Sequence, residues 1–338
     1  MLRIPYRNKI RLKKFAHGLL IALGVIFVAF VLLLIYSDSM IEYDREGAHL
    51  VGKFQQEETV EVPTEERPLI ENPVVVLQEK EAEMTQVKDM NGVVITTKML
   101  KDLDTVRALL AEITEPCAVY MEMKSVYGNY YYSSGFAFGN YPEGVDVNGV
   151  DALIAELLER GFYLIASVPA FPDRAYILEN ESLSLLKKGG YSWMDSRGCY
   201  WLDPAKDGSI SRLMQIALDL AERGFREVCF TEFCYPNGDN YRFNSEISKE
   251  EVIRNGVEKL TGLMAGSDVL ISFLVEGKNF PMDVAKGRVY VEGADGSQAD
   301  GYAENYNPAS GAMEVVFLTS SKDERFDNYA VLRPLMTE

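Results

Sequence analysis

The sequence has very little histidine. Its two histidines are His17 and His49, and both precede the part of the chain predicted to fold as a globular domain. A Ser-His-Asp triad, a Cys-His pair and a histidine-ligated metal are therefore excluded as the basis of any chemistry. Catalysis would have to use carboxylates, lysine, tyrosine, serine or cysteine, and no cofactor is expected.

Positive charge is also scarce. The 338 residues include 34 Lys plus Arg against 51 Asp plus Glu, a formal net charge of −17. Outside the first fourteen residues there is no basic patch. A surface of this sign repels phosphate backbones, so nucleic acid is not expected as a partner.

Cysteine occurs four times but never with CxxC spacing, which removes the usual zinc and thioredoxin-type signals. Cys117 and Cys229 lie in apolar runs, which is typical of buried thiols. Cys199 and Cys234 are the first pair to test for a disulfide. The acidic and amide-rich loops have too few spaced oxygens to predict calcium, so no metal site is predicted.

One long apolar run lies near the N-terminus. From Phe15 to Tyr36 there are 22 residues without a formal charge, enough for a helix to cross a hydrocarbon core of roughly 30 Å. Six basic residues precede the run and acidic residues follow it. Residues 1–37 are therefore predicted to be a cytoplasmic basic flank and a single-pass signal-anchor, which places the C-terminal part outside the cell. A cleaved signal peptide is the alternative.

Residues 38–91 have the composition of a tether. They carry fourteen acidic and five basic side chains and several prolines, and such a segment buries little and repels itself. An extended linker is predicted here, with a strand at 74–77 as the alternative. Residues 92–338 then form the globular domain, which is itself acidic.

A repeating unit organises residues 92–338. An amphipathic helix, a glycine and an apolar run follow one another at 151–168, 211–230 and 248–275. Gly161, Gly224 and Gly266 are predicted to be left-handed C-caps, and Ser248 with Glu251 forms a capping box. Helices alternating with continuous apolar strands predict a parallel sheet covered by helices.

The number of strands favours a closed barrel. Eight strands are predicted, at 93–97, 117–123, 162–168, 227–233, 269–275, 288–292, 315–319 and 329–333. Eight strands in a domain of this size predict a TIM (β/α)8 barrel. An open doubly wound sheet is the alternative, but its Gly-rich phosphate loop is missing. The short connections after the fifth strand predict shortened late helices.

Acidic residues follow several of these strands. In a TIM barrel the site lies at the C-terminal strand ends. The residues found there are Glu122 and Lys124 after the second strand, Asp173 after the third, Glu232 at the fourth, Glu276 at the fifth and Glu292 at the sixth. Paired carboxylates are the groups that cleave glycosidic bonds, one as acid and one as nucleophile or base. An acidic barrel with solvated loops would show the same ring without catalysis.

The segment between the third and fourth strands holds both tryptophans of the chain. Trp193 and Trp201 lie in YSWMDSRGCYWLDP, beside Asp195 and Asp203. Flat aromatic faces flanked by hydrogen-bond acceptors suit a sugar ring. The two indoles could equally form the core of a loop packed under the barrel rim.

The run from Gly92 to Phe243, with VLRPLM at 331–336, resembles the bacterial glycoside hydrolase-like family DUF4015, TIM-barrel relatives of the amylase-like enzymes. The matching residues after the second strand are Glu122, Lys124, Tyr127 and Gly128. Those after the third strand are Phe171, Asp173, Trp193, Asp195, Trp201 and Pro204, and Gly224, Phe225 and Glu227 lead into the fourth. The resemblance implies a barrel that acts on or binds carbohydrate.

Four positions depart from the family pattern. Ser167 replaces an Arg on the third strand, Thr231 and Cys234 replace an acidic residue and an Arg on the fourth, and Leu274 replaces an Asp on the fifth. Strand alternation puts Thr231 on the inward face and Glu232 on the other, unless a bulge turns it at the strand end. Glu232 is the only adjacent carboxylate that could replace the missing one.

The sequence thus predicts a membrane-anchored, cell-surface barrel that engages polysaccharide. If it is an enzyme, Glu232 and Glu122 are the predicted catalytic pair, with Glu276 or Glu292 as replacements. The predicted substrate-binding residues are Lys124, Tyr127, Asp173, Trp193, Asp195, Trp201, Asp203 and Thr231. The alternative is an inactive carbohydrate-binding or wall-associated module.

Overall fold

The computed structural model describes residues 41–44, 47–50, 90–137, 140–238, 240–277, 280–281, 288–306 and 315–336. The chain divides into two units, Met1–Leu77 and Gln78–Glu338, each considered by itself. In the first unit, β1 (Ile41–Asp44) pairs antiparallel with β2 (Gly47–Leu50). This hairpin lies inside the segment predicted to be extended. The division into domains stays a prediction.

The predicted membrane helix and the alternative strand at 74–77 lie outside the described residues. Within the part of the chain that is described, no helix is long and apolar enough to cross a bilayer.

The second unit is a closed parallel barrel of eight strands, in the order β10-β3-β4-β5-β6-β7-β8-β9. The strands are β3 (Asn91–Ile95), β4 (Ala118–Glu122), β5 (Tyr163–Pro169), β6 (Glu227–Thr231), β7 (Leu270–Val275), β8 (Val289–Glu292), β9 (Val315–Leu318) and β10 (Ala330–Pro334). Each predicted strand matches one of these to within about two residues. The TIM-barrel prediction is confirmed, and the open sheet is wrong.

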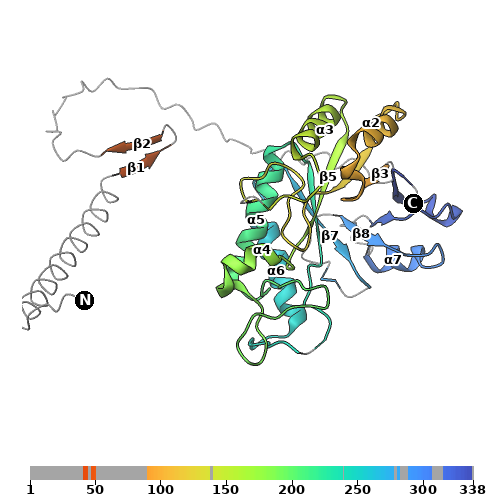
Figure 1. The fold of residues 1–338 in the computed structure, drawn as a ribbon. Coiled ribbons are helices and arrows are strands. Elements are labelled where there is room, and N and C mark those ends of the chain that lie inside the picture. Colours follow the sequence, from red (N-terminus) through yellow and green to blue (C-terminus); the bar gives the residue numbers. More distant parts are fainter. Residues whose placement is uncertain are drawn as a thin grey trace, which may run out of the picture. The chain divides into compact units, whose positions relative to one another are not determined.

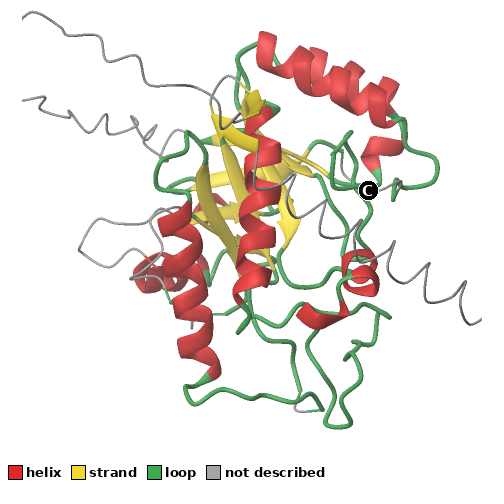
Figure 2. Cartoon of the chain, turned by 90° about the vertical axis from the view of Figure 1, so that its left-hand side faces the viewer, coloured by secondary structure: helices red, strands yellow, loops and turns green. Residues whose placement is uncertain are grey.

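Helices surround this barrel (Figures 1 and 2). They are α2 (Leu103–Ala111), α3 (Val147–Glu159), α4 (Arg174–Glu179), α5 (Asp207–Glu222), α6 (Lys249–Leu263) and α7 (Ala299–Tyr306), with short 3-10 turns η2 (Met99–Lys101), η3 (Glu181–Leu183) and η4 (Glu324–Phe326). Only η4 lies between β9 and β10, and α7 has 8 residues. The prediction of shortened late helices is therefore confirmed.

The predicted helix ends are confirmed in part. Gly161 and Gly224 have φ of 80° and 92°, the left-handed region that glycine adopts at little cost. Ser248 caps α6 by accepting a hydrogen bond from the Glu251 N–H. The prediction for Gly266 is wrong, because α6 ends earlier, at Leu263, and its C-cap residue Met264 has a φ of −93°.

Two apolar clusters arise from strand alternation. The larger lies between the strands and the helices, and the smaller fills the barrel interior. The interior cluster includes Tyr120 of β4, Ile165 of β5, Cys229 of β6 and Tyr290 of β8. Side chains two residues further along each strand face the same interior, one layer nearer the C-terminal ends.

Candidate functional site

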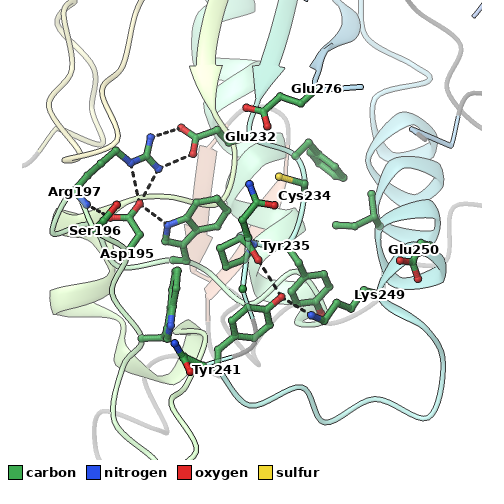
Figure 3. A pocket seen from close by; sticks show the side chains of 18 of the residues that line it. Asp195, Ser196, Arg197, Glu232, Cys234, Tyr235, Tyr241, Lys249, Glu250 and Glu276 are labelled. Atoms are coloured by element: carbon green, nitrogen blue, oxygen red, sulfur yellow. Dashed lines mark hydrogen bonds and ion pairs between the residues drawn. The ribbon is translucent and has the colours of Figure 1, made fainter. Parts of the chain in front are cut away.

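The candidate site is the end of the barrel where the parallel strands finish. A cavity of about 1060 Å³ adjoins it, and Figure 3 shows the side chains that line it. Its walls come from the ends of β6 and β7, the segment 193–201, the loop after β6 and the first turn of α6. This is where the fold predicts a site.

Glu122 and Glu292 end strands on opposite sides of the barrel, and the charge of Glu122 acts on Glu292. They end β4 and β8, which are four places apart in the eight-stranded ring and therefore opposite. Two residues earlier on the same strands, the rings of Tyr120 and Tyr290 meet across the axis with centroids 5.5 Å apart. The two carboxylates thus belong to the layer directly above that contact. Neither one lines the large cavity.

The electrostatics of this layer single out Glu292. Glu292 is exposed to solvent as a residue, but partial burial of its carboxyl group raises its pKa, and the negative charges of Glu122 and Glu276 raise it further. Glu276 follows β7, is exposed and lines the cavity. Glu122 accepts a hydrogen bond from the Thr97 N–H at 2.7 Å. Within the described residues, none of these three carboxylates has a salt bridge.

Glu232 has a different environment, which the sequence did not predict. Arg197 donates from Nη1 and Nη2 to its two carboxylate oxygens, at 3.0 and 2.6 Å. Glu232 has a φ of 52° and is the one non-glycine residue with positive φ in the described part of the chain. This turn lets the next residue, Phe233, pack against Phe171 and Phe273 while Glu232 faces Arg197 and the cavity.

Arg197 was missed by sequence reasoning. It is the one basic residue of YSWMDSRGCYWLDP, which is the only signal that could have found it. The hydrogen bonds to Glu232 raise its pKa, so the guanidinium stays charged. Arg197 and Glu232 are 35 residues apart, and only the closed barrel brings them together.

Asp195 connects Arg197 to the tryptophans. It accepts hydrogen bonds from Arg197 Nε at 2.9 Å, from the Cys199 N–H at 3.0 Å and from Trp201 Nε1 at 3.0 Å. Trp193 packs edge-on against Trp201 and Tyr241. Both indoles line the cavity, but they are only 8% and 4% exposed. Most of their area therefore forms a loop core, which agrees with the alternative reading of this motif.

Lys124 and Asp173 form a buried ion pair, with Nζ and Oδ2 3.0 Å apart. Burial lowers the pKa of Lys124, and Asp173 partly offsets this effect. Asp173 also caps α4 by accepting from the Tyr176 N–H. Neither residue lines the large cavity, so their observed contacts are with the protein itself.

The remaining predicted binding residues lie around this region. Tyr127 is 44% exposed and donates to the Arg197 carbonyl at 3.4 Å. Asp203 accepts from the Ala205 N–H, and burial raises its pKa. Thr231 ends β6 on the interior face, two residues after Cys229, as predicted from alternation.

The side chains at the positions that depart from the family pattern carry no charge and contact other uncharged groups where the structure shows their partners. Ser167 is buried and accepts a hydrogen bond from the Tyr120 hydroxyl at 2.9 Å. Leu274 packs against the interior cluster. All four cysteines are free, so the Cys199–Cys234 disulfide is not formed. Among the described residues, no group of three or more His, Cys, Asp or Glu could hold a metal ion.

Solved structures similar to this chain include glycoside hydrolases. A hypothetical protein from Ruminiclostridium thermocellum ATCC 27405 is 23% identical, with a TM-score of 0.47, over 54% of this chain and 96% of that chain. The alpha-galactosidase from Lactobacillus brevis is 11% identical, with a TM-score of 0.49, over 74% of this chain and 38% of that one. The glycoside hydrolase domain of PelA from Pseudomonas aeruginosa is 14% identical, with a TM-score of 0.43, over 73% and 94%. At these identities the similarity concerns the fold alone.

No curated protein matches the chain. The model of the family DUF4015, described as "Putative glycosyl hydrolase domain", matches residues 92–279, which is more than half of the 338 residues. This match runs from β3 through the end of β7 and includes the segment that carries Asp195, Arg197 and both tryptophans. The chain therefore belongs to DUF4015, a family of glycosyl hydrolase-like domains.

Proposed function

We propose that the barrel hydrolyses O-glycosidic bonds, with Glu292 as the general acid and Glu122 as its carboxylate partner. The observation that carries this proposal is that these two residues end opposite strands, one layer above the contact between Tyr120 and Tyr290. Two carboxylates on opposite sides of a scissile bond are what glycoside hydrolysis requires. From the sequence, Glu232 was predicted for one of these roles. Glu232 is paired with Arg197, and this favours Glu292 for the role.

The charges around the pair support distinct roles. A general acid must hold its proton near neutral pH, and the partial burial of the Glu292 carboxyl group and the like charges around it raise its pKa in that direction. Protonated Glu292 would donate to the leaving glycosidic oxygen. Glu122 would attack the anomeric carbon if the carboxyl groups lie about 5–5.5 Å apart, or activate a water at about 6.5–9.5 Å.

Glu276 links the pair to the cavity. It follows β7, between Glu232 and Glu292 in strand order, and its charge acts on Glu292. A glycan chain that occupies the cavity would reach the barrel mouth past this residue. The cavity is as large as the upper end of the usual range for ligand pockets, about 1,000 Å³.

The test is a hydrolysis assay with the full-length chain. The substrates are hexasaccharides of α-1,4-glucose, β-1,4-glucose and β-1,4-N-acetylglucosamine. We expect reducing ends to appear for one of them, and Glu292→Gln to lower the rate by about 10²–10⁴-fold. Glu246→Gln, an exposed residue outside the cavity, is the matched control and should leave the rate unchanged. Equal rates for parent and Glu292→Gln would contradict the assignment.

A non-catalytic carbohydrate-binding module is the second candidate. The neutral inward residues Ser167, Thr231 and Leu274 favour it, because three positions where the family has charged side chains have none here. Glycan binding without any release of reducing ends would support the module. Release that depends on Glu292 would support the enzyme.

We also propose that residues 1–37 anchor the domain in the cell membrane, with the N-terminus in the cytoplasm and the barrel outside the cell. The uncharged run from Phe15 to Tyr36 and its basic flank support this proposal. The test is protease treatment of intact cells that express the full chain. Digestion of the barrel with the N-terminus protected is expected, and protection of the barrel would contradict the orientation.

A further inference from the structure

We propose that Arg197 and Glu232 form a subsite that binds neighbouring sugar hydroxyls in the cavity that adjoins the barrel mouth. This inference rests on the proposed function, since it assumes a glycan ligand. It gives Glu232, the strand-end carboxylate that the sequence named as catalytic, a binding role instead. Arg197 then becomes a specificity-determining residue that no sequence motif indicated.

The pair is held rigidly on one side. Arg197 Nε and Nη2 contact Asp195 Oδ2 at 2.9 and 2.8 Å, and Trp201 Nε1 donates to the same oxygen at 3.0 Å. Asp195 is mostly buried and also accepts from the Arg197 and Cys199 N–H groups. A guanidinium fixed in this way loses little conformational freedom when a ligand binds.

The pair is open on the other side. The side chains of Arg197 and Glu232 are 42% and 22% exposed, and both line the cavity (Figure 3). Each can therefore contact a ligand without breaking the ion pair. The cavity continues from them toward Glu276 on one side and toward Tyr235 and Tyr241 on the other.

The free hydrogen-bonding capacity matches a diol. A guanidinium has five N–H donors, and three of those on Arg197 donate to the carboxylates of Asp195 and Glu232, while Nη2 also lies 2.8 Å from Asp195 Oδ2. One N–H on Nη1 remains, and each Glu232 oxygen keeps one lone pair. One donor beside two acceptors suits two adjacent hydroxyls, because each hydroxyl both donates and accepts. Contacts with charged partners are the stronger kind of hydrogen bond.

The backbone at Glu232 argues against a purely structural role. A φ of 52° is unfavourable for a residue with a side chain, and glycine would adopt it without strain. Strained positions of this kind cluster at ligand-binding sites, where the surrounding structure holds them.

The experiment measures glycan binding by calorimetry on the full-length chain carrying Glu292→Gln, which is expected to slow turnover strongly. The probes are the same three hexasaccharides. We expect Arg197→Met and Glu232→Gln to weaken the Kd by about 10- to 100-fold, the loss for hydrogen bonds to charged groups. Arg325→Met, which breaks an exposed pair with Asp323 outside the cavity, is the matched control and should leave the Kd unchanged.

Glu232→Gly separates binding from folding. It removes the carboxylate and relieves the strain, so we expect a Tm equal to or above that of the parent together with the same loss of affinity. Parent-like affinity in Arg197→Met and Glu232→Gly would overturn the subsite and leave the proposed function standing. If the Glu292→Gln chain binds none of the probes and the unmodified chain cleaves none, the result contradicts the proposed function, and with it the subsite that rests on that function.

Discussion

The two ends of the barrel interior hold glutamates in opposite situations. At the N-terminal end, Glu227 is fully buried and paired: Arg288 Nη1 donates to it at 2.5 Å, and the hydroxyls of Tyr290 and Tyr163 donate at 2.8 and 3.1 Å. At the C-terminal end, Glu122 and Glu292 have no salt bridge within the described residues. The same strand, β8, contributes Tyr290 to the lower network and Glu292 to the upper layer.

This difference separates stability from function within one interior. A buried carboxylate needs partners, because an unpaired charge in a low-dielectric core is costly. The lower network supplies those partners and closes the base of the barrel. The upper layer leaves its carboxylates available to a ligand, and partial burial together with like charges raises the pKa of Glu292. In barrels of this kind, the C-terminal face is the one used for chemistry.

The largest effect on stability is expected at the base. Arg288→Leu leaves Glu227 buried without its cation, and we expect the free energy of unfolding to fall by about 3–5 kcal/mol. Denaturant unfolding measures this change. Arg325→Leu, which breaks an exposed pair, should leave the free energy of unfolding nearly unchanged, because solvent screens this pair. Equal losses of free energy of unfolding in the two variants would show that the buried pair stabilises the protein no more than the exposed pair does.

A smaller effect is expected from Tyr290→Phe. This change removes the hydroxyl that donates to Glu227 at 2.8 Å, and a hydrogen bond to a charged group is worth about 1.5–3 kcal/mol. Thermal unfolding would show the loss. Tyr329→Phe removes a tyrosine–carboxylate hydrogen bond at the surface, to Asp300, and is the control. A Tyr290→Phe protein as stable as this control would mean that the base network contributes little.

At the mouth, the effect of Glu292→Gln on the free energy of unfolding should depend on pH. Because the folded protein has a raised Glu292 pKa, it keeps this proton to a higher pH than the unfolded chain does. The parent therefore loses stability as pH rises through the folded pKa, and the Gln variant does not. Solvent screens these charges, so we expect the variant to gain less than about 1 kcal/mol between about pH 4 and 8. A stability difference independent of pH would contradict the like-charge cluster.

The smallest effect is expected on the outer helices. Lys259→Ala breaks the pair between Lys259 Nζ and Asp207 Oδ1 at 2.6 Å, which joins α6 to α5. The Asp207 side chain is 88% exposed, so the free energy of unfolding should change by less than about 1 kcal/mol. A larger loss would show that surface pairs stabilise this barrel as strongly as the base network does.

The strand and helix positions were predictable because they depend on local patterns. Continuous apolar runs such as 162–168 and 227–233 predicted β5 and β6, and Gly161 and Gly224 marked the helix ends before them. Gly266 shows the limit of that reasoning. Helix α6 stops at Leu263, and the N–H of its C-cap residue Met264 bonds to carbonyls of the last turn, so no left-handed residue is needed.

The sequence predicted which site residues lie at strand ends, but it did not predict their partners. Glu122 and Glu292 were named because each ends a strand, and alternation placed Thr231 inward. The partners of these groups depend on long-range packing. Arg197 reaches Glu232 from a loop, and the backbone turn at Glu232 has no sequence pattern, so its pairing could not be foreseen.

The sequence by itself determined the barrel, its acidic character and the set of carboxylates at the strand ends, because periodicity and composition are local properties of the chain. Only the tertiary structure decided which carboxylates have partners. Closure of the ring brings β4 opposite β8 and the loop of Arg197 against β6, so electrostatic environments depend on residues distant in sequence. A glutamate is therefore a structural ion-pair partner at the base, as Glu227 is, and a candidate general acid at the mouth, as Glu292 is.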